Sequence, residues 1–257
     1  MSAARKRLLL LGGTSEARAL ARALAGENVD VTVSLAGATR RPAPVPGRLR
    51  TGGFGGAGGL AAYMRDEGIA ALVDATHPFA RTIAANAVAA AGDAGCQMVR
   101  LSRPAWRPGP GDRWLDFPDL ATALNALPPG SRTFLATGSG TRAALAMRPD
   151  LDCVLRSIEP LEGLSPRVTH IVARPPFDES EERSLFRREA VTHLVARNSG
   201  GTAGLAKLRA ARSLGLPVLM IARPAPPPGV ATVASVEAAL GWLRERLSLD
   251  TSSGAAP

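Results

Sequence analysis

Short hydrophobic runs alternate along this chain with longer stretches in which apolar residues recur at the spacing of an amphipathic helix. In the first half, the runs predict buried strands at residues 7–11, 29–35, 70–74 and 97–101. The intervening stretches predict helices at 14–25, from a glycine-rich turn at 52–59 to about 67, and at 80–91. Strands separated by helices indicate a mainly parallel sheet.

The same alternation resumes in the second half, after a break. Residues 102–114 carry three prolines and two glycines, which marks a domain boundary. Beyond it, strands are predicted at 133–136, 153–156, 169–173, 193–196 and 218–221. Helices are predicted at 120–126, 141–147, 179–189, 203–214 and 236–247. We therefore expect an α/β fold of two Rossmann-like domains with mainly parallel sheets and a ligand cleft between them, at 1–101 and 102–249, and a frayed tail at 250–257.

The composition is that of an ordinary globular chain, with 257 residues of which 46% are hydrophobic and 21% charged. No apolar run approaches the ~18–20 residues needed to cross a bilayer, so a cytoplasmic protein without membrane contacts is expected. Cys96 and Cys153 are the only cysteines. They are too few for a disulfide framework and lack the paired spacing of a zinc site, so no metal site is predicted.

The net charge of +9 raises the possibility of nucleic-acid binding, but its distribution argues against it. Of 31 basic residues only Lys6 and Lys207 are lysines, and the arginines are scattered without a basic tail. Six Phe, three Trp and one Tyr offer little stacking surface for single strands. The arginine bias is typical of genome-composition drift, and equally of a protein that binds anionic small molecules.

The segment Gly12-Gly13-Thr14-Ser15-Glu16 lies where the first strand turns into the first helix, with Thr14 as the expected N-cap. Backbone N–H groups and the helix dipole attract phosphate at such a turn. The segment lacks the full G-x-G-x-x-G spacing, and a purely structural tight turn has a similar sequence. A P-loop is excluded because neither lysine follows a glycine or precedes Ser or Thr.

The end of the second strand favours NADPH over NADH. Folds that bind NAD usually carry an acidic residue roughly 20 residues after the first glycine, and this chain has Ser34 there. Arg40 and Arg41 follow closely, as a 2′-phosphate would require. The alternative is a solvated arginine pair before the proline-rich loop at 41–46.

Two further segments lie at strand ends of the same predicted sheet. Gly52-Gly53-Phe54-Gly55-Gly56 allows close approach of backbone to a ligand, or forms a tight turn. Asp74-Ala75-Thr76-His77-Pro78-Phe79-Ala80 brings a titratable ring, a rigid proline and an aromatic side chain to the crevice above the sheet. His77 is the candidate functional histidine, whereas His170 and His193 fall at strand starts and are assigned to structure.

In the second half, polar segments again follow strands and begin helices. Thr137-Gly138-Ser139-Gly140 and Arg197-Asn198-Ser199-Gly200 offer hydroxyls, an amide and bare backbone to an anion, and Arg174 ends another strand. Ser and Asn also cap helices where no ligand binds. Together these segments are expected to line the side of a cleft that faces the first domain.

Three enzyme classes are excluded by missing motifs. The only tyrosine, Tyr63, has Glu67 four residues later, so the Tyr-x-x-x-Lys pair of short-chain dehydrogenases is absent. Thr137 precedes Gly138-Ser139-Gly140, so no Gly-x-Ser-x-Gly occurs, and there is no His-Glu-x-x-His. Serine hydrolases and zinc hydrolases are therefore excluded.

The sequence resembles the precorrin-6A reductases of cobalamin biosynthesis. The resemblance rests on Leu11–Arg18, Ser34–Gly37, Gly52–Gly56 and above all Val73–Ala80, in matching order and spacing, and it runs to Pro224. One departure is Arg197, where members often carry Lys before Asn-Ser-Gly. It keeps the positive charge but changes the geometry of a carboxylate contact.

The resemblance implies that NADPH and a tetrapyrrole meet between the two domains, the first binding the dinucleotide and the second the substrate. A hydride would pass from the nicotinamide to a macrocycle double bond, converting precorrin-6A to precorrin-6B. His77 is the catalytic candidate, as a proton donor or, by preference, as an orienting residue. Cofactor contacts are expected from Gly12, Gly13, Thr14, Ser15, Glu16, Ser34, Ala36, Gly37, Arg40, Arg41, Gly53, Phe54 and Gly55. Substrate contacts are expected from Thr76, His77, Pro78, Phe79, Thr137, Gly138, Ser139, Arg174, Arg197, Asn198 and Ser199.

Three other functions stay open at this point. The first is cobalt-precorrin-6A reduction, whose enzymes share these motifs. The second is a non-catalytic NADPH-binding module, and the third is a basic nucleic-acid binder whose affinity falls steeply with salt. A monomer is expected because no surplus apolar stripe is visible.

Overall fold

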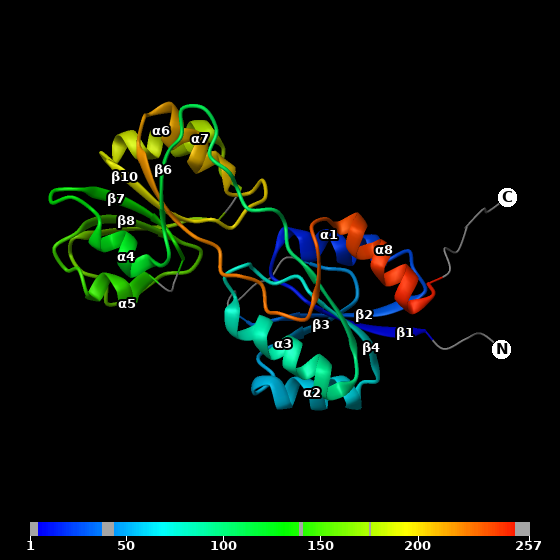
Figure 1. The fold of residues 1–257 in the computed structure, drawn as a ribbon. Coiled ribbons are helices and arrows are strands. Elements are labelled where there is room, and N and C mark those ends of the chain that lie inside the picture. The colour runs from blue at the N-terminus through cyan, green and yellow to red at the C-terminus, as the bar shows by residue number, and fades with distance from the viewer. Residues whose placement is uncertain (1–4, 38–43, 139–140, 175, 250–257) are drawn as a thin grey trace. The chain divides into compact units, whose positions relative to one another are not determined.

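The structure is a computed structural model that describes residues 5–37, 44–138, 141–174 and 176–249. The chain forms two compact units (Figure 1). The first contains Met1–Pro104 together with Pro224–Pro257, and the second contains Ala105–Arg223. Both are six-stranded parallel sheets with helices on their two faces, so the predicted α/β class with mainly parallel sheets is confirmed.

The sheet of the first unit has the strand order β12-β5-β4-β1-β2-β3, which is typical of dinucleotide-binding folds. Its strands are β1 (Lys6–Leu11), β2 (Val29–Leu35), β3 (Arg48–Thr51), β4 (Ile69–Asp74), β5 (Gln97–Leu101) and β12 (Ala231–Val233). Its helices are α1 (Ser15–Leu24), α2 (Gly56–Asp66), α3 (Arg81–Ala94) and α8 (Val236–Leu247).

The central strand β1 is apolar on both sides because helices cover both faces of the sheet. Leu8 and Leu10 pack in the cluster that includes α1 and α8, and Leu9 and Leu11 pack in the cluster that includes α2 and α3. Figure 1 shows these helix pairs on opposite faces of the sheet. A strand buried on both faces therefore appears as a continuous hydrophobic run rather than an alternating one.

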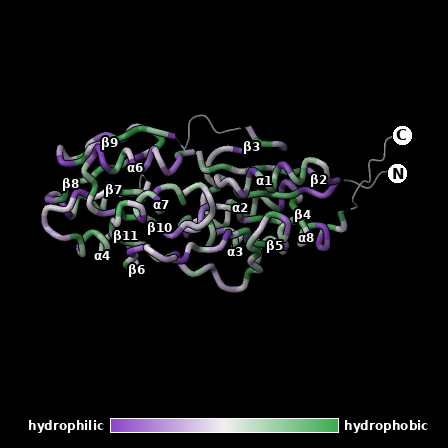
Figure 2. Tube along the Cα trace, turned by 90° about the horizontal axis from the view of Figure 1, so that it is seen from above, coloured by the Kyte–Doolittle hydropathy of each residue, from purple (hydrophilic) through white to green (hydrophobic). Residues whose placement is uncertain are grey.

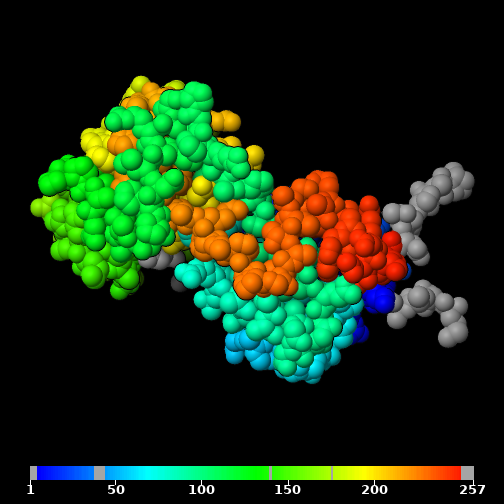
Figure 3. All heavy atoms as spheres, in the orientation of Figure 1, coloured from blue at the N-terminus to red at the C-terminus, as the bar shows by residue number. Residues whose placement is uncertain are grey.

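The C-terminal segment belongs to the first unit, which corrects the predicted domain at 102–249. β12 pairs with β5 through Ala231 and Val99, and α8 buries Ala239 and Leu243 in the core beside α1. In Figure 3 this segment, orange to red, covers part of the first unit. The chain leaves the first unit after Pro104 and returns at Pro224, because the apolar face of α8 has its matching surface there.

The second unit repeats the α/β plan with the strand order β6-β11-β10-β7-β8-β9. Its strands are β6 (Arg113–Phe117), β7 (Arg132–Ala136), β8 (Asp152–Ser157), β9 (Val168–Val172), β10 (His193–Arg197) and β11 (Pro217–Ile221). Its helices are α4 (Leu120–Asn125), α5 (Thr141–Ala146), α6 (Glu179–Arg188) and α7 (Leu205–Ser213). Figure 2 marks hydrophobic residues in green, and the central strands of both units are buried.

Three strands were not predicted, namely β3, β6 and β12. Each lies at the edge of its sheet, and most of its residues are exposed or half-buried. An edge strand needs few apolar side chains, so its sequence carries little hydrophobic signal. Arg113 and Trp114 of β6 fall inside the segment 102–114, for which a domain boundary and no strand was predicted.

None of the helices in the described ranges is both long and apolar enough to cross a bilayer.

Candidate functional site

The order of the first sheet reverses between β1 and β4, and ligands of open α/β sheets bind at the carboxyl ends of the strands at such a point. The turns that follow β1 and β4 are in direct contact there. Thr14 Oγ1 donates a hydrogen bond of 2.7 Å to the carbonyl oxygen of Ala75, and the N–H of Ala75 donates to the carbonyl oxygen of Leu11 at 3.0 Å. The two segments singled out in the sequence, around Gly12 and His77, therefore belong to one site.

The glycine turn after β1 leaves backbone exposed at the N-terminus of α1. Thr14 caps the helix, as predicted, by accepting a 3.1 Å hydrogen bond from the N–H of Ala17. Gly13 has a φ of 112°, and a Cβ added there would meet no atom within 4 Å. Gly12 instead packs closely, since a Cβ would lie 3.2 Å from Leu35. This arrangement suits a phosphate on the first turn of the helix.

Glu16 lies in this first turn and is neutralised by an arginine. Arg103 Nη1 contacts Glu16 Oε2 at 2.5 Å, and Ser15 Oγ donates to the same oxygen at 3.0 Å. Burial opposes ionisation of Glu16, but a backbone hydrogen bond and Arg103 outweigh it and hold its pKa below the usual value. The ion pair therefore limits repulsion between this carboxylate and a bound phosphate.

A buried carboxylate positions the turn after β4. Asp74 is fully buried, and its Oδ1 accepts hydrogen bonds from both the N–H and the hydroxyl of Thr76, at 3.0 and 2.6 Å. Its Oδ2 is paired with Arg100 Nη1 at 2.5 Å, and Arg100 is only 4% exposed. Neither Asp74 nor Arg100 was predicted as a site residue, although an acidic residue at the end of a buried strand was a usable signal.

Two hydrogen bonds within the turn fix the orientation of His77. The N–H of Phe79 donates a 3.2 Å hydrogen bond to Nδ1 of His77, and the Ala80 N–H donates to the His77 carbonyl at 2.8 Å. Because Nδ1 is an acceptor, the proton of the neutral ring is on Nε2. Pro78 is buried and His77 is half-buried, so the ring is anchored without being sealed in the core.

The carboxyl ends of β2 and β3 lie at this same end of the first sheet, next to β1 in the strand order. Ser34 is buried and its carbonyl oxygen accepts from the Gly12 N–H at 2.9 Å, while Ala36 and Gly37 follow β2. Arg50 of β3 holds the glycine turn of Gly53 and Phe54, a role that the sequence did not indicate. Arg40 and Arg41 lie outside the described residues.

The order of the second sheet reverses between β7 and β10, where Thr137-Gly138 and Arg197-Asn198-Ser199 follow the strands. The two oxygens of the Thr137 and Thr141 hydroxyls lie 2.5 Å apart. Burial lowers the pKa of Arg197, although an arginine stays charged at neutral pH. Ser139 lies outside the described residues.

Two predicted substrate residues have specific partners within the second unit. The side-chain amide of Asn198 bonds both the N–H and the carbonyl of Trp106, at 2.8 and 3.0 Å, and so anchors this segment of chain. Arg174 follows the edge strand β9 and donates to Glu159 Oε1 at 2.8 Å. β9 is separated from β7 by β8, so Arg174 is not at the point where the strand order reverses.

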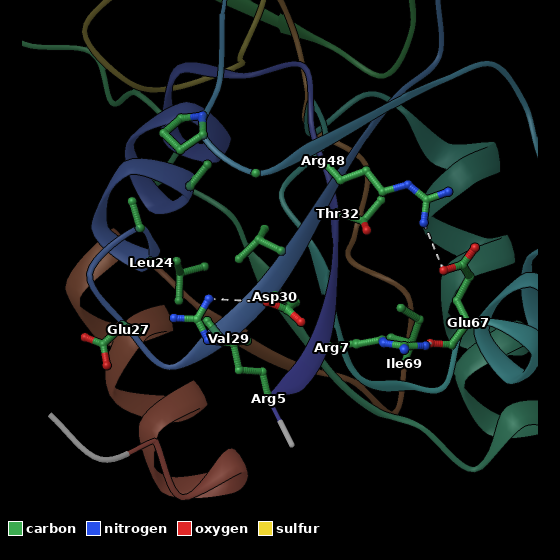
Figure 4. Close-up of a pocket in the computed structure, with 15 residues that line it drawn as sticks. Arg5, Arg7, Leu24, Glu27, Val29, Asp30, Thr32, Arg48, Glu67 and Ile69 are labelled. Atoms are coloured by element: carbon green, nitrogen blue, oxygen red, sulfur yellow. Dashed lines mark hydrogen bonds and ion pairs between the residues drawn. The ribbon is translucent and has the colours of Figure 1, made fainter. Parts of the chain in front are cut away.

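A hollow of ≈ 530 Å³ lies at the other end of the strands of the first sheet, near the amino ends of β1 and β2 (Figure 4). Two ion pairs join side chains of its lining. Arg5 contacts Asp30 at 3.5 Å, Arg48 contacts Glu67 at 3.0 Å, and Arg7 donates to the Glu67 carbonyl. A second hollow, of ≈ 630 Å³, lies beside α5 and has a largely apolar lining. Neither contains a residue singled out in the sequence.

Within the described part of the chain, no group of three or more His, Cys, Asp or Glu side chains could hold a metal ion. The strand order and the turn at the first helix define a Rossmann-like α/β protein. A family model described as Precorrin-6x reductase CbiJ/CobK matches residues 7–244. The chain belongs to this precorrin-6x reductase family.

Individual relatives agree with this assignment over most of the chain. The precorrin-6A reductase of Rhodobacter capsulatus is 44% identical over 242 residues, which cover 93% of this chain and 96% of the relative. A solved structure described as CobK precorrin-6A reductase has a TM-score of 0.89 at 43% identity and covers 94% of this chain and 97% of its own. The cobalt-precorrin-6A reductase of Priestia megaterium is 28% identical over 231 residues, covering 84% and 90%.

Proposed function

We propose that this chain reduces precorrin-6A to precorrin-6B and takes the hydride from NADPH. The family assignment supports the reaction class. The observation that carries the proposal is the contact between Thr14 and Ala75, which joins the glycine turn after β1 to the His77 turn after β4. A dinucleotide held at the first turn would thus lie beside the second.

The residues of the first unit fit a pyridine dinucleotide. Gly13 offers open backbone at the start of α1 for the pyrophosphate, and Ser34 at the end of β2 has no carboxylate to repel a 2′-phosphate. The nicotinamide, when bound, supplies a hydride to a carbon of the macrocycle. The chain's own residues bind and orient the reactants and exclude water. Arg40 and Arg41 remain proposed contacts of the 2′-phosphate.

The polar residues of the second unit are proposed to bind the acidic arms of the macrocycle. Arg197 and Arg174 supply positive charge, and the segments at Thr137-Gly138 and Ser199 supply hydroxyls and backbone N–H groups. Asn198 would act indirectly, since its amide already bonds Trp106.

His77 is proposed to orient a reactant through its Nε2–H rather than to donate a proton. The reason is that Nδ1 already accepts the Phe79 N–H, which leaves Nε2 as the ring nitrogen that can contact a reactant. The variant His77→Ala is expected to lower kcat/KM for the tetrapyrrole about tenfold, the value of one hydrogen bond to a polar partner. His77→Gln, which retains an N–H donor, should recover part of the loss. Turnover of His77→Ala equal to wild type at saturating substrate would remove His77 from the site.

The metal-free substrate is favoured because identity to the precorrin-6A reductase of Rhodobacter capsulatus is 44%, against 28% to the cobalt-precorrin-6A reductase of Priestia megaterium. The test mixes purified protein and NADPH with precorrin-6A or with its cobalt form and follows both chromophores. We expect NADPH oxidation and the tetrapyrrole absorbance change together, and faster with the metal-free substrate. Faster reaction with the cobalt form would reverse the assignment. Dinucleotide binding without any tetrapyrrole change would favour a non-catalytic module.

A further inference from the structure

Arg50 is fixed at the carboxyl end of β3 by contacts with the glycine turn that follows it. Its Nη1 donates to the Gly52 carbonyl at 2.7 Å, and its Nη2 donates to the Gly53 carbonyl at 2.9 Å. The guanidinium carbon lies 3.7 Å from the centre of the Phe54 ring, stacked on its face, and 5.1 Å from the centre of the Tyr63 ring. These contacts hold the guanidinium in one orientation.

The charge of this guanidinium is not compensated by a carboxylate. All of its hydrogen-bond acceptors in the described part of the chain are neutral, namely two carbonyl oxygens and, at 3.5 Å, the Ser34 hydroxyl. Other arginines of the first unit, such as Arg48, Arg100 and Arg103, are paired with acids. Arg50 therefore places a positive charge, with no paired carboxylate among the described residues, at the carboxyl ends of the strands, where anionic ligands are expected.

The hydrogen bonds leave one edge of the guanidinium without an acceptor among the described residues. Nε–H and the second hydrogen of Nη2 point the same way and form the parallel pair of donors that suits a phosphate. The guanidinium group lies at the ends of β3 and β2, since Nη1 is 3.5 Å from the Ser34 hydroxyl and these two strands are paired. In dinucleotide-binding folds the ribose next to the adenine is bound at the end of the second strand.

We propose that Arg50 binds the 2′-phosphate of NADPH through this pair of donors and so sets the preference for NADPH over NADH. The inference rests on the proposed use of NADPH. It adds a specificity-determining residue that is already oriented before the cofactor binds, because the Phe54 ring and two backbone carbonyls hold its side chain.

The test measures binding of two nucleotide fragments by calorimetry, using adenosine 2′,5′-bisphosphate and 5′-AMP with the whole chain. The variant Arg50→Met removes the charge but can still pack on Phe54. It is expected to weaken binding of the bisphosphate at least about tenfold, since a hydrogen-bonded ion pair is lost, and to change 5′-AMP binding less than about twofold. Arg50→Lys should lie between, because lysine keeps the charge without the pair of parallel donors.

The matched control is Arg48→Met on the same strand, since Arg48 is paired with Glu67. It should leave both fragments unaffected. Equal weakening of both fragments in Arg50→Met would mean that Arg50 only supports the turn, and this would overturn the inference. A wild-type protein that binds both fragments equally would also overturn it. NADPH oxidation driven by precorrin-6A, measured on the same wild-type sample, tests the proposed function separately.

Discussion

Asp74→Ala is expected to lower the free energy of unfolding by about 3–5 kcal/mol, the usual cost of removing one partner from a buried ion pair. The reason is that Arg100, 4% exposed, would keep its charge without a carboxylate. The loss also removes both hydrogen bonds to Thr76, so the turn that carries His77 loses its anchor. Urea unfolding followed by circular dichroism measures the stability, and steady-state kinetics measures the activity.

A matched control and a double variant separate the two effects. Asp30→Ala removes an exposed ion pair with Arg5 in the same sheet and should cost less than about 1 kcal/mol. The double variant Asp74→Ala with Arg100→Met no longer buries an unpaired cation, and should be more stable than Asp74→Ala alone. It should nevertheless stay poorly active, because Thr76 has still lost its acceptor. Full activity in the double variant would show that Asp74 does not position the turn.

Gly59→Ala is expected to displace the glycine turn before α2. A Cβ at Gly59 would lie 1.8 Å from the carbonyl oxygen of Phe54, which is backbone and cannot rotate away. Gly59 therefore allows the turn to fold back over the first residues of the helix. We expect a loss of about 1–3 kcal/mol in the free energy of unfolding, the usual cost of forcing extra atoms into a packed site. Affinity for the proposed cofactor NADPH should fall as well, because the turn carries Gly53 and its carbonyls hold Arg50.

The neighbouring residue Gly58 provides the control for this variant. It lies in the same helix, and a Cβ there would meet no atom within 4 Å. Gly58→Ala should stabilise the protein by up to about 1 kcal/mol, because alanine favours helix more than glycine does. Thermal unfolding and NADPH titration of both variants make the comparison. If Gly59→Ala matched Gly58→Ala in both measurements, the proposed closeness of the turn and helix would be refuted.

Secondary structure was predictable wherever an element is buried. The predicted bounds of the second strand, 29–35, and of the last helix, 236–247, coincide with the observed β2 and α8. Thr14 was identified as an N-cap because its side chain and position satisfy a local rule. The edge strands β3, β6 and β12 were missed, since a strand that pairs on one side and faces water requires few apolar residues, whereas the edge strand β9 was predicted.

The segments that form the candidate site were predictable from the sequence, but the side chains that pair with one another within it were not. The sequence indicated the glycine turn after β1 and the histidine turn after β4, because turns and strand ends have characteristic residue types. The roles of Arg100 and Arg103 could not be predicted, since each depends on a carboxylate brought close only by folding. Nothing in an arginine's neighbours along the chain distinguishes a buried ion pair from a solvated side chain.

Local and periodic features of the chain were sufficient to predict the fold class and the alternation of strands and helices, and the resemblance of its motifs indicated the family. Strand order, the return of residues 224–249 to the first unit, and the hydrogen bond from Thr14 to Ala75 required the folded structure. The physical reason is the distance along the chain between the residues that interact. Hydrophobic period, capping and turn chemistry act between residues a few positions apart, whereas these features depend on contacts between residues far apart in the sequence, 61 positions for Thr14 and Ala75 and still more for α8 and α1.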